Sequence, residues 1–381
     1  MDRRYAKSLG EDLPLLSFGV MRLEKNEDGE INMEQSIAMV ERAMKEGINY
    51  FDTAMPYLAK KSESFVGEVL SRFPREDYFL ADKLPIYYIK EEGDMERYFQ
   101  EQLDNCKTDY FDFYLVHSLS DAPRLETFDK FRLYDFMQKA KAEGKIRHVG
   151  FSFHGNMETF HQLLDTYQWD FVQIQMNYYD WVDINAKELY ETLEKRGIPT
   201  FVMEPAKGGF LSTFAPHIEE KMRALRPNDS PSSWAMRWVA SHSNIATVLS
   251  GMSNPEQVED NIKTFTNLEP ITAEEQKVLD EIVLEIQSIK AVPCTKCNYC
   301  MPCPMGVKIP TVFNIYNNYK KTGNEAFLKM QYNNTNIILP EQRADSCVNC
   351  GACVVECPQL IPIPQWMEEI HETLDQLGAT K

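Results

Sequence analysis

Eight of the nine cysteines lie in two short runs near the end of the chain, and their spacing is that of metal ligands. The first run is Cys294-x2-Cys297-x2-Cys300-x2-Cys303-Pro304, and the second is Cys347-x2-Cys350-x2-Cys353-x3-Cys357-Pro358. The second run has the spacing of bacterial iron–sulfur ligands, and the first is one residue shorter before its final Cys-Pro. Such tight spacing lets three thiolates of one loop reach adjacent corners of a [4Fe–4S] cluster.

The sequence therefore predicts two [4Fe–4S] clusters, each with three ligands from one run and the fourth from the Cys-Pro of the other. The predicted ligands are Cys294, Cys297, Cys300 and Cys357 for one cluster, and Cys347, Cys350, Cys353 and Cys303 for the other. Structural zinc usually takes cysteines as separated pairs, so these dense runs favour iron–sulfur, with zinc as the alternative. The ninth cysteine, Cys106, stands alone and is interpreted as a small buried apolar side chain.

A second group, Asp52, Tyr57, Lys83 and His117, has the chemistry needed to reduce a carbonyl. The carbonyl oxygen must receive a proton, and a tyrosine is a reluctant acid unless a neighbouring ammonium lowers its pKa from the ordinary value near 10. Lys83, held by Asp52, is predicted to act on Tyr57 in this way, while His117 orients the carbonyl oxygen through a hydrogen bond. Taken singly, each residue also has a structural explanation, as a helix cap, a loop contact, a solvated lysine or a core histidine.

The positions of these residues favour the catalytic interpretation, because Asp52, Lys83 and His117 each end a strand-like run of apolar residues. Such runs alternate with amphipathic helical stretches, which predicts an α/β fold with parallel strands, a (β/α)8 TIM barrel. In this barrel the strand C-termini and the following loops form the catalytic face. The predicted strands are Ile48–Thr53, Tyr78–Lys83, Phe111–His117, Val149–Phe153, Phe171–Met176, Thr200–Met203 and Thr247–Leu249, with Thr264–Leu268 as the candidate for the eighth.

Helical patterning continues beyond the predicted strands and through the cysteine-rich part. The predicted helices include Met33–Lys45, Ala186–Lys195, Thr272–Ile289, Thr311–Tyr319 and Glu325–Tyr332. The last two lie between the cysteine runs. We therefore predict two domains, a barrel over residues 1–282 and a mainly α-helical, ferredoxin-like iron–sulfur domain over residues 283–381.

The composition of the chain limits its partners. The formal net charge of −18 disfavours nucleic acid and anionic lipid, because both are bound through basic surfaces. No apolar run reaches the roughly 18 residues of a membrane span, and residues 1–5 lack the apolar stretch of a signal peptide. Nine cysteines without such a signal indicate metal or redox chemistry, so we expect a cytoplasmic protein.

Several motifs carry a family resemblance. They are Phe18-Gly19-Val20-Met21-Arg22-Leu23, Phe51-Asp52-Thr53-Ala54-Met55-Pro56-Tyr57, Asp112-Phe113-Tyr114-Leu115-Val116-His117, Gly150-Phe151-Ser152, Val172-Gln173 and Gly251-Met252-Ser253-Asn254-Pro255-Glu256-Gln257. In order and spacing they resemble the aldo-keto reductase family from about Leu9 to Leu268. The resemblance implies reversible, nicotinamide-dependent chemistry on a small carbonyl or alcohol substrate. It also implies that Tyr57 is the proton donor, Lys83 and Asp52 its tuners and His117 the orienting residue.

The resemblance further implies contacts to NADP or NAD. Ser152, Gln173 and Met203 match positions around the nicotinamide, although the family's Asn after the serine is replaced by Phe153 and its stacking aromatic residue by Met203. Lys207 and Gly209 are the candidates for the diphosphate. Gly251, Ser253, Gln257 and Asn261 lie in the stretch that holds the nucleotide phosphate, and the last three match the variant found in potassium-channel beta subunits. A Lys and an Arg common in this stretch are absent here, so the choice between NAD and NADP stays open.

The cysteine-rich part resembles the all-helical dicluster domains of larger oxidoreductases, and a barrel followed by such a domain is typical of anaerobes. Together these features predict an oxidoreductase that couples carbonyl reduction, or its reverse, to electron transfer through two clusters. A redox protein is then a possible partner, and a flavin would link two-electron and one-electron steps, although no flavin motif is present. The alternatives are a plain carbonyl reductase with structural clusters and a non-enzymatic redox sensor.

Overall fold

The computed structural model describes residues 1–26, 29–335 and 337–379 and divides the chain into two compact units. The first unit consists of Met1–Pro205 and Ser233–Ile271, and the second of Ala206–Ser232 and Thr272–Lys381. The predicted domain limits, 1–282 and 283–381, remain a prediction, and residues 380 and 381 lie outside the described residues. Among the described helices, none combines the length and the apolar character that a membrane span requires.

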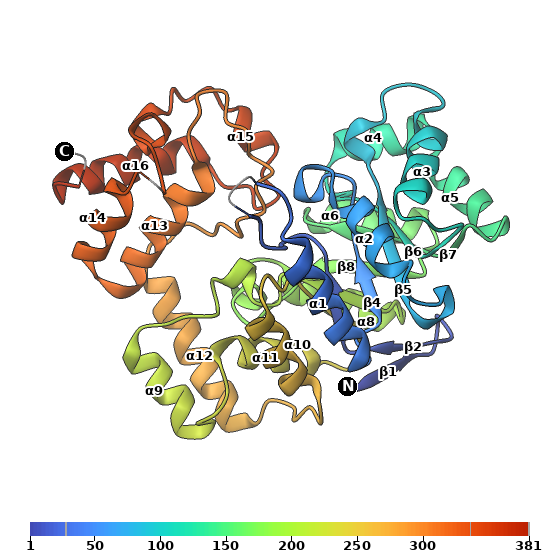
Figure 1. Cartoon of the computed structure of the whole chain (residues 1–381), viewed down its shortest axis with the longest axis horizontal. Coiled ribbons are helices and arrows are strands. Elements are labelled where there is room, and N and C mark those ends of the chain that lie inside the picture. Colours follow the sequence, from blue (N-terminus) through green and yellow to red (C-terminus); the bar gives the residue numbers. More distant parts are fainter. Residues whose placement is uncertain (27–28, 336, 380–381) are drawn as a thin grey trace. The chain divides into compact units, whose positions relative to one another are not determined.

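The first unit is built on a closed barrel of eight parallel strands, as the sequence predicts (Figure 1). Neighbouring strands follow the order β10-β3-β4-β5-β6-β7-β8-β9 around the barrel. The strands are β3 (Leu16–Gly19), β4 (Tyr50–Asp52), β5 (Phe79–Leu84), β6 (Phe111–Val116), β7 (Ile146–Phe153), β8 (Phe171–Gln175), β9 (Thr200–Met203) and β10 (Ile245–Ser250). Most of their residues are buried on both faces, because side chains fill the interior and helices cover the outside.

One end of the barrel interior is filled by aromatic rings. Tyr50 lies 5.1 Å from Phe113, and Phe171 lies 4.6 Å from Phe201, measured between ring centroids. An N-terminal hairpin, β1 (Arg3–Ala6) and β2 (Glu11–Pro14), belongs to the same core cluster through Ala6 and Leu13. This end is therefore closed by packed rings, and the functional face of such a barrel lies at the C-terminal ends of the strands.

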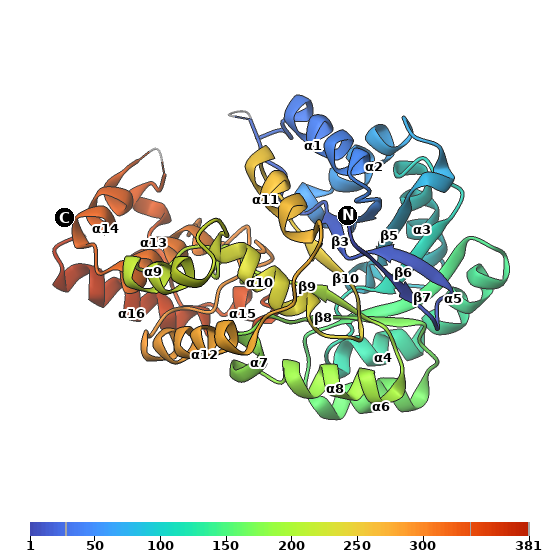
Figure 2. The same cartoon turned by 90° about the horizontal axis from the view of Figure 1, so that it is seen from below.

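Helices surround the barrel, and Figure 2 shows α6 and α8 on its outer side. The helices of this unit are α1 (Met33–Lys45), α2 (Ser62–Leu70), α3 (Asp94–Asn105), α4 (Ala122–Lys130), α5 (Leu133–Ala142), α6 (Met157–Thr166), α7 (Asp180–Asp183), α8 (Ala186–Arg196) and α11 (Pro255–Phe265), with most of α10 (Pro231–Ala240). The predicted helix Met33–Lys45 is confirmed, and Ala186–Lys195 is one residue short. After α8 the chain turns at Gly197, whose φ of 68° a residue with a Cβ adopts only with strain.

The predicted eighth strand, Thr264–Leu268, is wrong. Thr264 and Phe265 end helix α11, and the hydroxyl of Thr264 donates a hydrogen bond to the carbonyl of Asp260 at 2.8 Å. A β-branched threonine is compatible with a helix end when its hydroxyl bonds back to the preceding turn in this way. The eighth strand is β3, which is only four residues long and precedes the region of regular strand–helix alternation.

The second unit is mainly α-helical, as predicted. Its helices are α9 (Pro216–Leu225), α12 (Ala273–Ser288), α13 (Ile309–Thr322), α14 (Glu325–Asn333), α15 (Ala352–Val355) and α16 (Ile363–Gln376). Helices α12, α13 and α14 confirm the three helices predicted here, with ends that differ by at most three residues. The core around the cysteine runs is formed by α13, α14 and α16, through residues such as Phe313, Tyr316, Leu328 and Met367.

Gly67 in α2 gives a test of how tightly the barrel helices pack. A Cβ at this position would lie 2.1 Å from the backbone oxygen of Asn105 at the end of α3. We expect Gly67→Ala to lower the free energy of unfolding by at least about 1 kcal/mol, because this clash outweighs alanine's better helix propensity. Urea denaturation followed by circular dichroism measures the change. The exposed neighbour Glu68→Ala is the control and should change stability by less than about 0.5 kcal/mol; equal stability of the two variants would contradict the prediction.

Candidate functional site

The structure brings the four predicted catalytic residues together at the C-terminal ends of adjacent strands. Asp52 is the last residue of β4, Lys83 is the fifth residue of β5, and His117 directly follows β6. Tyr57 begins a short 3-10 turn, η1 (Tyr57–Ala59), in the loop after β4. All four side chains are buried, with between 1% and 8% of their surface exposed. Because β4, β5 and β6 are neighbours in the barrel, the sequence spacing converts into spatial proximity.

Lys83 is the centre of this group. Its Nζ donates hydrogen bonds to Asp52 Oδ1 at 2.6 Å and to the carbonyl oxygen of Thr53 at 2.7 Å. The same Nζ lies 4.8 Å from the centroid of the Tyr57 ring. Burial by itself lowers the pKa of Lys83, but the negative charge of Asp52 opposes it and the net pKa is raised. Lys83 is therefore a fixed ammonium at neutral pH.

The pKa of Tyr57 reflects two opposing effects. Burial raises this pKa, and the ammonium of Lys83 lowers it through its charge and a side-chain hydrogen bond. The effect of Lys83 has the predicted direction, but burial is the larger contribution and the net pKa lies above 10. The phenol is thus protonated at neutral pH and keeps a proton available for transfer.

His117 lies beside Tyr57 and is held in the neutral form. Its ring centroid is 5.8 Å from that of Tyr57 and 5.6 Å from that of Tyr87, both in edge-on geometry. Burial lowers the pKa of His117 well below 6.5, and the positive charge of Lys83 lowers it further. A neutral imidazole carries one N–H donor, which is what an orienting hydrogen bond to a carbonyl oxygen requires.

Three predicted nicotinamide contacts lie on adjacent strands of the first unit. Ser152 pairs with Gln173 in the register of β7 and β8, and Gln173 Nε2 is 3.6 Å from the sulfur of Met203 in β9. Ser152 Oγ accepts a hydrogen bond from the backbone N–H of Ser118 at 2.7 Å. The side-chain oxygen of Gln173 is buried and has no hydrogen-bond partner in the described structure. A buried acceptor without a partner costs free energy, and the N–H of a ligand's carboxamide group could satisfy it.

The predicted phosphate contacts after β10 lie in the loop before α11 and within the first two turns of that helix. The backbone N–H of Ser253 donates to Gln257 Oε1 at 2.8 Å, and Asn261 Nδ2 donates to Ser250 Oγ at 2.9 Å. At Gly251 an added Cβ would lie 3.0 Å from Arg22 Cδ. These side chains are already bonded to one another, so the helix N-terminus is preformed.

Sequence reasoning missed an ion pair in this unit. Arg22 Nη2 lies 2.9 Å from Glu204 Oε1, and Glu204 is close enough to Tyr57 to raise the pKa of its phenol slightly. The available signal was a charged residue shortly after each of the strands β3 and β9, in the loops that form the catalytic face.

Lys207 and Gly209 belong to the second unit, whereas the other predicted nucleotide contacts belong to the first. They lie in the short turn η4 (Lys207–Gly209), and a Cβ at Gly208 would be 2.2 Å from the backbone oxygen of Thr295. The glycine at 208 is thus explained by the close approach of the first cysteine run. The diphosphate role of Lys207 and Gly209 remains a prediction.

The thiols of the second unit influence one another across the two cysteine runs. The pKa of Cys294 is raised to about 12, mainly by burial and in part by repulsion from the thiolates of Cys297 and Cys357. Burial likewise raises the pKa of Cys300, with contributions from Cys297, Cys294 and Cys357. The final cysteine of the second run therefore lies next to the first run.

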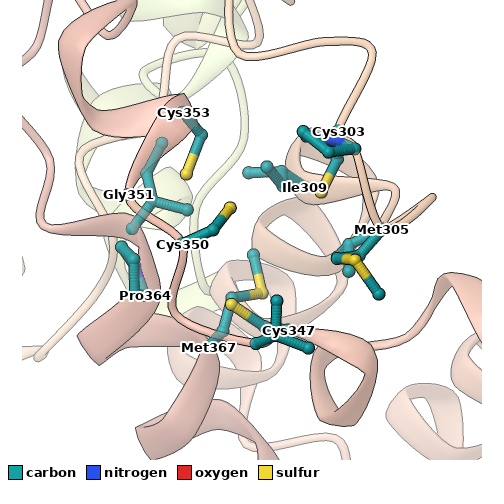
Figure 3. A pocket seen from close by; sticks show the side chains of 13 residues that line it. Cys303, Met305, Ile309, Cys347, Cys350, Gly351, Cys353, Pro364 and Met367 are labelled. Atoms are coloured by element: carbon teal, nitrogen blue, oxygen red, sulfur yellow. The ribbon is translucent and has the colours of Figure 1, made fainter.

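In the same way, Cys303, the final cysteine of the first run, lies beside cysteines of the second run. Burial raises the pKa of Cys353, and repulsion from Cys347, Cys303 and Cys350 adds to the effect. Figure 3 shows these four cysteines around one hollow, which encloses about 340 Å³ including its opening to solvent. Its remaining lining is apolar or glycine, with Ile309, Met305 and Met367 among the contributors.

The arrangement of the thiols can be compared with what metals require. Among the described residues, no three His, Cys, Asp or Glu side chains converge closely enough to hold a single metal ion. The four thiols of Figure 3 instead surround a space, and a cubane cluster binds its four thiolates at four separate irons. Metal binding would also remove the thiolate repulsion that raises these pKa values, because the metal takes the place of the protons. The residues present therefore fit [4Fe–4S] clusters.

Comparison with known proteins agrees with both units. Residues 15–284 match the aldo/keto reductase family, and residues 293–361 match the 4Fe-4S dicluster domain. L-galactose dehydrogenase from Arabidopsis thaliana is 26% identical over 287 residues, covering 69% of this chain and 87% of that protein. The NADH-specific methylglyoxal reductase of Escherichia coli is 25% identical over 280 residues, covering 62% and 84%.

Solved structures show the same barrel. A holo aldo-keto reductase from Bacillus halodurans has a TM-score of 0.58 and 23% identity, covering 74% of this chain and 96% of that one. An aldo-keto reductase from Klebsiella pneumoniae in complex with NADPH has a TM-score of 0.59 and 21% identity, with the same coverage. With a family match that spans most of the chain, a closed barrel and oxidoreductase relatives, the chain belongs to the aldo/keto reductase family.

Proposed function

We propose that this protein reduces a small carbonyl substrate, or oxidises the corresponding alcohol, with a nicotinamide cofactor, and that its second unit binds two [4Fe–4S] clusters. The observation that carries the enzymatic part is the hydrogen-bonded pair Lys83–Asp52 beside Tyr57, with His117 next to the same ring. This geometry supplies a proton donor, a fixed positive charge and a neutral hydrogen-bond donor at one point.

The roles of the four residues follow from their electrostatics. When bound, the nicotinamide supplies the hydride. The N–H of His117 holds the carbonyl oxygen close to the Tyr57 hydroxyl, and Tyr57 transfers its proton to that oxygen as negative charge develops there. The ammonium of Lys83 stabilises the phenolate that remains, and Asp52 keeps this ammonium in place. In the reverse direction the phenolate accepts the proton of the alcohol.

The nicotinamide pocket is proposed on adjacent strands. The unsatisfied oxygen of Gln173 would accept a hydrogen bond from the carboxamide, and the thioether of Met203 would cover the ring. Ser152 Oγ lies on the neighbouring strand and completes the set. The NADPH complex of the Klebsiella neighbour and the NADH specificity of the Escherichia coli relative support a dinucleotide without selecting between the two.

For the iron–sulfur part, we propose that the Cys294, Cys297, Cys300 and Cys357 thiolates bind one cluster and the Cys347, Cys350, Cys353 and Cys303 thiolates bind the other. The clusters, when bound, each store one electron. Their proposed role is to exchange electrons with a redox protein partner, since the thiol of Cys350 lies at the exposed surface.

Replacing Tyr57 with Phe removes the proton donor and leaves the ring in place. We expect Tyr57→Phe to lower kcat for aldehyde reduction by about a hundredfold to ten-thousandfold, the usual contribution of general acid catalysis. Nucleotide affinity, measured by fluorescence titration, should be unchanged. Tyr50→Phe is the matched control, because the Tyr50 hydroxyl lies in the packed barrel core and has no hydrogen-bond partner in the described structure. Full activity of Tyr57→Phe would contradict the proposed role.

The pKa directions predict the pH dependence of the reduction. The reactive form has Tyr57 protonated and His117 neutral, and the raised pKa of Tyr57 and the lowered pKa of His117 keep both in this form between about pH 7 and 9. The rate of the chemical step should therefore be flat over this range and fall only above the pKa of Tyr57. Single-turnover kinetics with an aldehyde and the reduced nucleotide measure it. An ionisation near pH 7 or 8 that Tyr57→Phe abolishes would show that the ammonium of Lys83 outweighs burial.

Iron content tests the proposed ligands. The anaerobically purified protein should contain about eight iron atoms and Cys357→Ser about four, because Cys357 is proposed to complete a single cluster. Cys106→Ala is the control and should keep the full content, since Cys106 is buried in the barrel beside Asp82. Zinc in place of iron in the anaerobic protein would contradict the proposal, as would full iron content in Cys357→Ser.

A further inference from the structure

An ammonium group in the second unit lies in an apolar setting and has no anionic partner among the described residues. Lys321, near the end of α13, donates a hydrogen bond from Nζ to the carbonyl oxygen of Phe210. The same Nζ lies 3.7 Å from the centroid of the Phe210 ring and 5.6 Å from that of Phe214. Within the described part of the chain no carboxylate pairs with Lys321, and burial lowers the pKa of this lysine to about 7. An uncompensated cation in such surroundings favours a nearby negative charge.

A second lysine adjoins the first within the cysteine run itself. Lys296 lies between Cys294 and Cys297, and its backbone N–H donates to the sulfur of Cys294 at 3.4 Å. Its charge contributes to the lowered pKa of Lys321, so the two ammonium groups are close enough to repel each other. Lys296 also lowers the pKa of the Cys294 thiol, in opposition to burial.

The turn η4 holds this arrangement together. Gly208 permits the close approach of the turn to Thr295, and a Cβ at Gly209 would lie 3.7 Å from the Lys296 ammonium. The next residue, Phe210, supplies both the carbonyl and the ring that contact Lys321. The turn thus contacts the first cysteine run through Gly208 and Gly209, and it contacts Lys321 through Phe210. Both ammonium groups therefore lie close to this turn and to the first cysteine run.

The other thiol group has different surroundings. The hollow bordered by Cys303, Cys347, Cys350 and Cys353 has no charged side chain among its lining residues (Figure 3). The raised pKa of Cys353 is due mainly to burial, with repulsion from the neighbouring thiols of Cys347, Cys303 and Cys350. The apolar side chain of Val348 beside this group is also 59% exposed. The two groups are therefore electrostatically unequal.

We propose that Lys321 and Lys296 provide the counter-charge for the cluster bound by Cys294, Cys297, Cys300 and Cys357, and thereby raise its reduction potential above that of the other cluster. This inference rests on the proposed binding of two clusters. A [4Fe–4S] centre with four thiolates is anionic, and reduction adds one more negative charge. Nearby positive charge stabilises the reduced form more than the oxidised form, and net charge and exposure are known determinants of the potential.

The test is a potentiometric titration of the anaerobically purified full-length protein, with dithionite as reductant and electron paramagnetic resonance as readout. The wild type should show two reduction steps. Lys321→Met should shift only the higher-potential step to lower potential, and this step should be the one that is lost in Cys357→Ser. Lys320→Met is the matched control on the same helix. The Lys320 ammonium contacts the Tyr316 ring, 5.6 Å from the ring centroid, instead of Phe210, so this variant should shift neither step.

The other outcomes of this titration also test the inference. The inference would be overturned if Lys321→Met binds two clusters with unchanged potentials, or if it shifts the lower-potential step. Either result would leave the proposed function standing. If Lys321→Met loses a cluster, Lys321→Arg separates the explanations. If Lys321→Arg keeps both clusters and the wild-type potentials, the counter-charge role is supported. If both variants lose the cluster, Lys321 has a packing role and the inference is overturned. Absence of iron from the wild-type protein would instead contradict the proposed function itself.

Discussion

The proposed catalytic group depends on one constraint, which is that the buried ammonium of Lys83 must be compensated inside the barrel. A buried charge is tolerated only when it is paired and hydrogen-bonded, and both partners of Lys83 come from the neighbouring strand β4 and the residue after it. Ala81 pairs with Asp52 in the strand register, so Lys83, two residues further along β5, reaches the carboxylate and the carbonyl of Thr53 from above. Strand register and electrostatics therefore specify the same geometry.

The Lys83 ammonium also explains why the two neighbouring titratable groups, Tyr57 and His117, respond differently to its charge. Burial pushes the pKa of Tyr57 up and that of His117 down, so both are neutral in the resting protein. Lys83 opposes burial at Tyr57 but reinforces it at His117, because a positive charge favours a phenolate and disfavours an imidazolium. One fixed charge thus favours proton release from the tyrosine while it keeps the histidine a neutral hydrogen-bond donor.

The second unit presents the converse case. Lys321 is a cation in an apolar setting that has no carboxylate partner in the described structure. It lies near Lys296 of the first cysteine run, and in this run burial and mutual repulsion raise the pKa values of the Cys294 and Cys300 thiols. Isolated thiolates and an isolated lysine ammonium are both energetically unfavourable in these surroundings. The proposed anionic iron–sulfur cluster would relieve both, because the metal would replace the thiol protons and the cluster would compensate the ammonium. The turn that begins at Lys207 belongs to this arrangement through Gly208 and Phe210.

The sequence by itself determined the features that are encoded within a few residues. Helix periodicity located α1 and α8, and strand-like runs located seven of the barrel strands together with the predicted catalytic residues at their ends. Cysteine spacing predicted the crossover that places Cys357 next to the first run. Only the tertiary structure decided features that join distant segments, namely the identity of β3 as the closing strand, the Arg22–Glu204 pair and the contact of Gly208 with Thr295. The direction of the Tyr57 pKa also belongs here, because burial depends on the packing of the whole site, and no local pattern records its magnitude.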